Sequence, residues 1–218
     1  MTKQGKDSAI RYDEGCLAAH ALNLVGDRWA LLLVRELMFS AKRFQRLRAG
    51  LPGVTASVLT RRLAQLQEAH VVDYDPQLAT YVLTDAGRRL LPVLESLCRW
   101  ALMVPGHDPT RFISPSALMI SMGVTLRREQ SAGHDMLAGF DFGTEAFEMR
   151  IQRGRLNTIS VAPPVAPFVL SGSGNALASA VYGKTPLKGL IRNKTIRAQG
   201  DLGAAQDFVG WFELRPRQ

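Results

Sequence analysis

Residues 71 to 84, VVDYDPQLATYVLT, interrupt a sequence that is otherwise patterned for helices throughout its first half. Two runs rich in β-branched and aromatic residues flank Asp75-Pro76-Gln77, and this arrangement is typical of a β-hairpin. Any fold of the first half must therefore place one short antiparallel hairpin among helices.

Helical periodicity surrounds this hairpin on both sides. Before it, apolar residues recur at helical spacing in 16–25, 28–39, 43–49 and about 54–69, with glycine or proline between most of these stretches. After it, the sequence predicts one long helix from about Asp85 to Met103, with Thr84 as its N-cap. Four helices, a hairpin and a long helix, in this order, predict a mainly α winged helix-turn-helix domain.

Basic residues are concentrated between positions 42 and 62. This segment contains no acidic residue, so it supplies most of the formal net charge of +8. A charge run of this kind is often only a solvated helical face. Because this one precedes a hairpin and a long helix at the spacing of a winged helix-turn-helix, we interpret it as a surface for double-stranded DNA.

The fourth expected helix separates apolar from polar residues. Leu59, Leu63 and Leu66 recur at helical spacing and predict a buried stripe. Hydroxyl groups and arginines then face elsewhere, near the helix N-terminus. Such side chains suit entry into the major groove, where they bond base edges or phosphates, and the helix dipole favours the same approach.

Two roles are assigned within the predicted DNA-binding surface. Ser57, Thr60 and Arg61 are the candidates for reading bases, because they oppose the leucine stripe. The arginines before the turn are the candidates for phosphate contacts. The complete predicted DNA-binding set is Lys42, Arg43, Arg46, Arg48, Thr55, Ser57, Thr60, Arg61 and Arg62.

Loop-forming residues mark the middle of the chain. The stretch VPGHDPTRFISPS, starting at Val104, predicts a boundary between one domain of residues 1–105 and a second of residues 106–218. Beyond it, helical patterns alternate with strand patterns. The helices are expected at 118–129, 175–184, 185–193 and 201–214, and the strands at 140–152, 156–163, 168–172 and 195–200. The second domain is therefore predicted to be α+β.

The first half is similar to a known family. Cys16, LVGDRWALLLVREL (24–37), RFQRLRAGLPGVTASVLTRRLAQLQEAHVV (43–72) and YVLTDAGRRLLPVLESLCRWA (81–101) resemble the HxlR-type winged-helix regulators, which are relatives of the MarR type. The resemblance implies a homodimeric transcription regulator that binds a pseudo-palindromic operator. One departure concerns the wing, which carries Asp73 and Asp75 and no lysine or arginine, so weak wing contact with DNA is expected.

The second half also carries a resemblance. FEMRIQRGRLNTISVAPP (147–164) and ALASAVYGKTPLKGLIRNKTIRAQGDLGAAQDFVGWF (176–212) resemble a sterol-carrier-protein-like domain. This resemblance implies an apolar small-molecule effector in a tunnel between sheet and helices. The candidate lining residues are Met119, Met122, Phe147, Met149, Phe168, Leu187, Phe208 and Trp211. Each of them fits an ordinary hydrophobic core equally well.

Catalytic chemistry finds no support in the sequence. The four histidines are scattered, and no known nucleophile, metal or phosphate-loop motif is present, so we expect neither an enzyme nor a cofactor or metal. Cys16 and His20 are spaced as half of a metal site, but no further ligands lie near them in the sequence. Some HxlR-type proteins use a cysteine at the position of Cys16 as a redox sensor; a structural role for this thiol is the alternative.

These observations predict a ligand-responsive DNA-binding regulator, a repressor, in the reducing cytoplasm. Its homodimer is expected to form through the long helix, with the first helix as a further candidate, while the same residues are needed in part to close the winged-helix core. The candidates on the long helix are Leu90, Leu91, Val93, Leu94, Leu97 and Trp100. The alternative is a carrier of lipids or other apolar ligands whose winged helix makes protein contacts. No membrane association is expected, since no long apolar run occurs.

Overall fold

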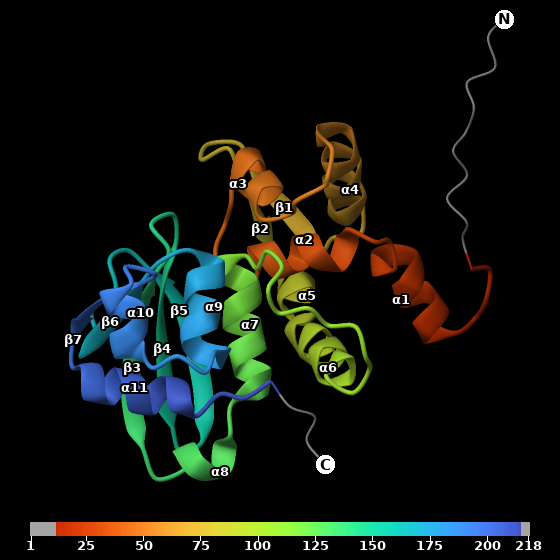
Figure 1. The fold of residues 1–218 in the computed structure, drawn as a ribbon. Helices are drawn as coiled ribbons and strands as arrows, with labels where there is room; N and C mark the ends of the chain where they lie inside the picture. Colours follow the sequence, from red (N-terminus) through yellow and green to blue (C-terminus); the bar gives the residue numbers. More distant parts are fainter. Residues whose placement is uncertain (1–11, 215–218) are drawn as a thin grey trace, which may run out of the picture.

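The computed structural model describes residues 12–214 (Figure 1). The elements before residue 102 are α1 (Leu17–Val25), α2 (Ala30–Leu37), α3 (Phe44–Ala49), α4 (Ala56–Glu68), β1 (Val72–Asp75), β2 (Thr80–Leu83), α5 (Asp85–Arg88) and α6 (Leu91–Ala101). Strands β1 and β2 pair antiparallel, with Val72 opposite Leu83. This part of the chain is a winged helix-turn-helix, as predicted.

Local side-chain hydrogen bonds fix several of these boundaries. The Thr55 hydroxyl caps α4 by accepting a hydrogen bond from the Val58 amide, and Thr84 caps α5 in the same way, as predicted. At the hairpin turn, the Asp75 carboxylate accepts hydrogen bonds from the amides of Gln77 and Leu78, at 2.8 and 3.1 Å.

The predicted long helix from Asp85 to Met103 is wrong, because two helices occupy this stretch. The first, α5, ends at Arg88, and α6 begins at Leu91. Pro92 lies in the first turn of α6. Proline has no amide hydrogen and its ring clashes with the carbonyl four residues earlier, so a continuous helix through this point is disfavoured.

The second part of the chain contains a mixed five-stranded sheet with the order β5-β4-β3-β6-β7. Its elements are α7 (Pro115–Thr125), α8 (Arg128–Ser131), β3 (Asp135–Asp141), β4 (Ala146–Gln152), β5 (Arg155–Val161), β6 (Phe168–Ser171), α9 (Gly174–Tyr182), α10 (Leu187–Arg192), β7 (Arg197–Gly200) and α11 (Leu202–Gly210). All neighbouring strands pair antiparallel except β3 and β6, which are parallel. The α+β prediction is confirmed at this level.

One predicted strand, over residues 140–152, is instead a hairpin. The chain turns after β3, where the Asp141 carboxylate accepts the Gly143 amide at 2.7 Å and Gly143 has a φ of 75°. Most of β3 was missing from the prediction. Gly139 lies within it, where an added Cβ would come 2.8 Å from Val169 of β6, so the close approach of these strands requires glycine.

Helices α9 and α11 lie over one face of this sheet, and α11 packs on β3 and β6 (Figure 1). Beneath them lies the hydrophobic core of the second part, which includes Phe140, Phe147, Phe168 and Phe208, all fully buried. A separate core fills the winged helix.

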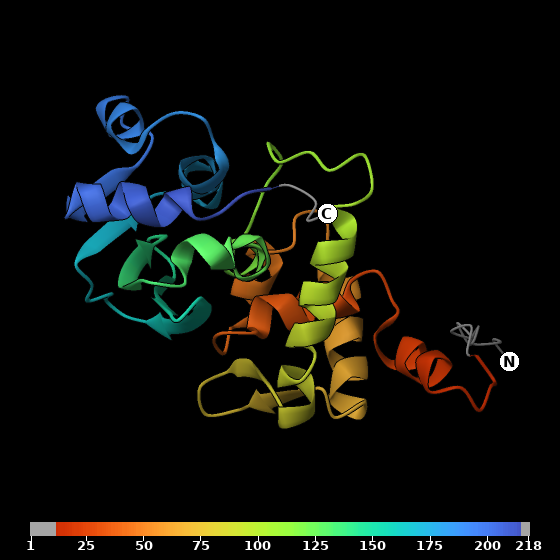
Figure 2. The same ribbon diagram turned by 90° about the horizontal axis from the view of Figure 1, so that it is seen from below.

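The two parts are joined by direct contacts. Helix α7 packs on α2 and α6, and its Ile120 is buried in the core of the winged helix. Phe39 lies between the two cores, with its ring centroid 5.7 Å from that of Phe147. Helix α1 projects from the winged helix away from the second part in both views (Figure 2). The boundary predicted at residue 105 remains a prediction.

Within residues 12–214, no single helix has the length and apolar character needed to cross a membrane, although α1 and α2, bent by 74°, would pass the same criteria as a pair.

Candidate nucleic-acid interface

Helix α4 has the two faces that its sequence predicts. Leu59, Leu63 and Leu66 are buried in the winged-helix core, with exposures of at most 1%. On the other side, the base-reading candidates Ser57, Thr60 and Arg61 are exposed, as is Thr55. The Thr55 and Ser57 hydroxyl oxygens lie 3.2 Å apart at the helix N-terminus. This end of α4 therefore presents hydroxyl groups and a guanidinium beside the positive end of the helix dipole.

The arginines of the preceding element are also accessible. Arg43 is the N-cap of α3, and Arg46 and Arg48 lie in its last turn. All three are exposed, and none forms an ion pair with another residue in the described part of the chain. Their guanidinium groups are available for phosphate oxygens, which they bind through bidentate hydrogen bonds.

Lys42 does not belong to this surface, and its predicted contact with DNA is wrong. Its side chain is only 4% exposed. The ammonium lies 3.4 Å from the Glu36 carboxylate and 2.8 Å from that of Glu145, and it donates to the Ser116 hydroxyl at 3.0 Å. The sequence did not reveal this burial, because Ser116 and Glu145 belong to the second part of the chain.

Arg62 is also drawn away from the exposed face. It forms an ion pair with Asp27, at the turn between α1 and α2, and it donates to the Gln65 side chain. Its side chain is 18% exposed. Arg62 thus holds α4 against the start of α2, and a direct role on DNA would require it to leave Asp27.

The wing, from Val72 to Leu83, contains no lysine or arginine. Asp73 is exposed on β1, while Asp75 stabilises the turn through the hydrogen bonds described above. Tyr74 and Tyr81 pack together, with ring centroids 4.9 Å apart, and burial raises the pKa of Tyr81. The expectation of weak wing contact with DNA remains a prediction that fits this arrangement.

Cys16 is exposed at the N-terminus of α1, where it is the N-cap residue. The nearby backbone amides of Ala19 and Ala18 lower the pKa of its thiol. A lowered thiol pKa favours the thiolate, which is the form that oxidants attack. The alternative of a buried structural thiol is wrong, and redox sensing by Cys16 remains a prediction. No group of three or more potential metal-ligating side chains occurs among the described residues, so Cys16 and His20 have no further ligands there.

The apolar residues proposed for dimerisation divide between two environments. Leu94 is buried in the winged-helix core, and Leu90 and Leu91 pack against it. The other three are exposed on α6: Val93 at 43%, Leu97 at 44% and Trp100 at 56%. They are spaced four and three residues apart, so they form one stripe along the helix. Leu17 and Leu22 of α1 are exposed as well, at 86% and 52%.

The residues predicted to line an effector tunnel lie in the packed core of the second part. Met119, Met122, Phe147, Met149, Phe168, Leu187, Phe208 and Trp211 are all at most 8% exposed. None of them lines the cavity described next. Binding of a ligand among these side chains would require the core to open, and it remains a prediction.

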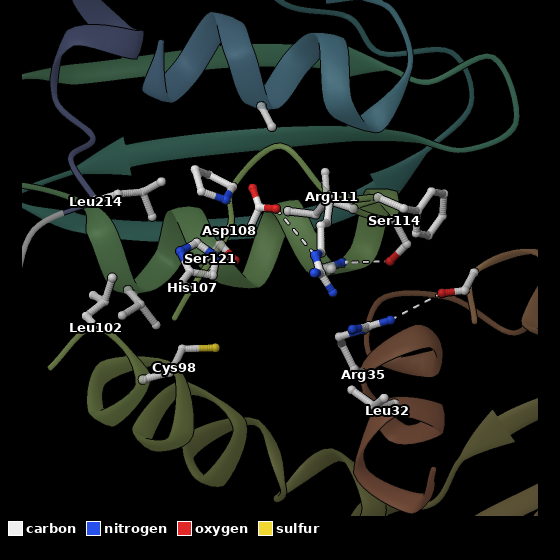
Figure 3. Close-up of a pocket in the computed structure, with 18 of the residues that line it drawn as sticks. Leu32, Arg35, Cys98, Leu102, His107, Asp108, Arg111, Ser114, Ser121 and Leu214 are labelled. Carbon is white, nitrogen blue, oxygen red and sulfur yellow. Dashed lines mark hydrogen bonds and ion pairs between the residues drawn. The ribbon is translucent and has the colours of Figure 1, made fainter. Parts of the chain in front are cut away.

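A cavity of about 670 Å³ lies instead where the two parts of the chain meet (Figure 3). Its walls come from α2, α6, α7, α9, the turn between α3 and α4, and the segment between α6 and α7. No sequence pattern predicts this site, because its lining residues come from many separate elements. The one local signal is the loop composition after Val104, which predicts a boundary between two domains.

Comparison with known proteins shows which family the winged helix resembles. The sequence model of the HxlR-like helix-turn-helix proteins matches residues 24–107. Over 103 residues the chain is 34% identical to YvaP of Bacillus subtilis (strain 168), an HTH-type transcriptional regulator, covering 45% of this chain and 88% of YvaP. The chain belongs to the HxlR-like helix-turn-helix family. It is a transcriptional regulator of the HxlR and MarR type, a type that binds DNA. Since the match takes up most of YvaP, that relative has little length left for a second part of the kind seen here.

Two solved structures show weaker likeness. One is the quinone-bound YodB from B. subtilis, which is 29% identical with a TM-score of 0.38. The match covers 40% of this chain and 97% of YodB. The sec-alkylsulfatase Pisa1 from Pseudomonas sp. is 19% identical, with a TM-score of 0.43, and covers 91% of this chain and 30% of that enzyme. At such TM-scores neither likeness establishes a common fold.

Proposed function

We propose that this HxlR-like regulator is a homodimeric, ligand-responsive repressor that binds a pseudo-palindromic operator in the cytoplasm. The observation that supports this proposal best is the exposed polar end of α4, opposite its buried leucine stripe. The exposed arginines of α3 precede it in the chain. The two recognition helices of a dimer then read half-sites about one DNA turn apart.

The proposed ligand response depends on the second part of the chain. A winged helix-turn-helix reads DNA with its own elements, so an additional mixed sheet with covering helices has another purpose. The sterol-carrier-like resemblance favours an apolar small molecule as the effector. A ligand of this kind regulates only if it binds the DNA-bound and DNA-free forms with different affinity.

Phosphate contacts by the α3 arginines predict a steep dependence of affinity on salt. Replacing Arg46 with alanine should weaken binding to all DNA sequences alike and flatten the plot of log affinity against log salt concentration. The slope should change by about 0.9 for each phosphate that is no longer neutralised, and thus by about 2 in a dimer. Mobility-shift titrations at several salt concentrations measure this change.

The matched control is Arg192→Ala, which removes an exposed arginine from α10 in the second part. Its salt slope should equal that of the wild type. An unchanged slope for Arg46→Ala would remove Arg46 from the phosphate-binding residues. Failure of the wild-type protein to bind the DNA beside its own gene would favour the alternative of a ligand carrier.

Base reading by Arg61 predicts a different outcome. Removing a bidentate hydrogen bond to guanine costs on the order of 1–3 kcal/mol and relaxes the preference at one base pair. Arg61→Ala should therefore reduce the ratio of operator to random-DNA affinity, which competition titrations measure directly. An equal reduction on both DNAs would make Arg61 a phosphate-binding residue instead.

A further inference from the structure

The cavity between the two parts combines apolar walls with cationic groups. Trp29 and Leu32 at α2, Leu102 after α6, and Phe112 form part of the apolar lining. A volume of about 670 Å³ falls within the range of small-molecule sites, which runs from about 300 to 1,000 Å³. The site is thus large enough for a ligand of drug or fatty-acid size.

The charges around this cavity are mostly positive. Arg28, Arg35 and Arg111 line it, and Asp108 is the only acidic lining residue among those described. The Arg111 guanidinium lies 3.3 Å from Asp108, and Arg28 lies over the Trp29 ring, 5.3 Å from its centroid. Figure 3 shows Arg35, Arg111 and the Cys98 sulfur around the same hollow, from three separate segments. An anionic group on an otherwise apolar ligand would meet an excess of positive charge here.

One wall of the cavity belongs to the helix-turn-helix turn itself. Residues Gly50, Leu51 and Pro52, between α3 and α4, contribute to the lining. Arg35 donates to the Gly50 carbonyl at 3.2 Å and to the buried Glu36 carboxylate at 2.8 Å. A ligand that repositions Arg35 would therefore act on the turn that precedes the recognition helix.

From these contacts we infer that the junction cavity is the effector site, and that its ligand is an amphipathic anion with an apolar body and one acidic group. This inference rests on the proposed function, and it moves the effector from the core of the second part to the junction. A ligand bound in this cavity contacts α7 and α9 of the second part together with α2 and the turn before α4. The ligand thereby changes operator affinity.

The test uses the full-length protein with decanoate as the probe and decanol as its uncharged counterpart. Calorimetric titration should give one decanoate site per chain, with decanol binding more weakly. Arg111→Glu should lower decanoate affinity by roughly fivefold, because an exposed ion pair contributes at most about this factor to binding. It should leave decanol affinity unchanged. Arg128→Glu is the matched control, because Arg128 is exposed on α8 and does not line the cavity.

Alkylation of Cys98 tests whether decanoate binds in the cavity. Cys98 lines it, whereas Cys16 is exposed on α1, so the chain carries its own control thiol. Burial raises the pKa of the Cys98 thiol, and alkylation with iodoacetamide is therefore run at about pH 9. Decanoate should slow alkylation of Cys98, as measured by peptide mass spectrometry, and leave that of Cys16 unchanged.

The outcomes separate this inference from the proposed function. Equal decreases of decanoate affinity in Arg111→Glu and Arg128→Glu, or an unprotected Cys98, would overturn the cavity as the site. Decanoate should also reduce operator binding, and bound decanoate without that effect would overturn the coupling. Absence of operator binding before any probe is added would instead contradict the proposed function.

Discussion

Replacement of Lys42 by methionine is expected to lower the free energy of unfolding by about 3 kcal/mol. The change removes the ammonium between Glu36, which is 1% exposed, and Glu145, which is 16% exposed. Removing one partner of a buried ion pair costs about 3–5 kcal/mol, because the remaining charge stays desolvated. The lower end of this range applies, since Arg35 still pairs with Glu36 at 2.8 Å. Urea denaturation followed by tryptophan fluorescence measures the destabilisation.

The next residue in the chain supplies the control. Arg43 is exposed, so Arg43→Met should change stability by no more than about 0.5 kcal/mol. It should instead weaken DNA binding. Neutralising Glu145 as well, in Lys42→Met/Glu145→Gln, should recover part of the stability, and the double-mutant cycle measures the coupling. Normal stability with weakened DNA binding in Lys42→Met would return Lys42 to the DNA surface.

This result bears on how the two parts of the chain depend on each other. Glu36 accepts a hydrogen bond from Ser114 at 2.6 Å, and the Ser116 hydroxyl donates to the Glu36 backbone carbonyl at 3.3 Å. The buried side chains of Glu36 and Lys42 in the winged helix therefore have hydrogen-bond and ion-pair partners after position 105. The second part is a structural partner of the DNA-binding elements as well as the proposed sensor.

Local patterns in the sequence predicted the parts of the fold that depend on near neighbours. The leucine stripe of α4 and the cap at Thr84 involve contacts within a few residues, and both are found in the structure. The break before α6 was also local, since Pro92 marks it, but the apolar periodicity of the stretch outweighed it in the prediction. A strong period does not by itself imply an unbroken helix.

Long-range contacts account for the residues that the sequence misplaced. Lys42 contacts Ser116 and Glu145, which lie 74 and 103 residues further along the chain. The basic composition around Lys42 therefore gives no sign that its side chain is buried. The residues predicted to line an effector tunnel are apolar, and apolar character is common to a packed core and a ligand site. The cavity at the junction has no sequence pattern, because its walls are assembled only when the two parts meet.

The proposed dimer forms through an apolar face of α6. Val93, Leu97 and Trp100 form an exposed apolar stripe on α6, which a monomer would leave in contact with water. Leu97→Glu places a charge at the centre of this stripe and is expected to convert the dimer into a monomer. Light scattering after size-exclusion chromatography measures the change in mass.

Dissociation of the dimer should affect DNA binding far more than it affects the fold. A dimer holds its second recognition helix at high effective concentration over the second half-site, and this linkage raises avidity by about 10²–10⁴-fold. Leu97→Glu should therefore reduce affinity for the full operator by at least about 100-fold. Affinity for an isolated half-site should stay at the wild-type value, because the exposed face of α4 is untouched.

A leucine elsewhere provides the matched control for this change. Leu202 is 37% exposed at the start of α11, and Leu202→Glu introduces the same charge where no dimer contact is proposed. It should leave both mass and operator affinity unchanged. If Leu97→Glu remains dimeric, the partner must be held elsewhere, and the exposed Leu17 and Leu22 of α1 become the next residues to change. If half-site affinity falls together with full-operator affinity, the substitution has disturbed the winged helix itself, and the α6 stripe belongs to its folding and not to dimerisation.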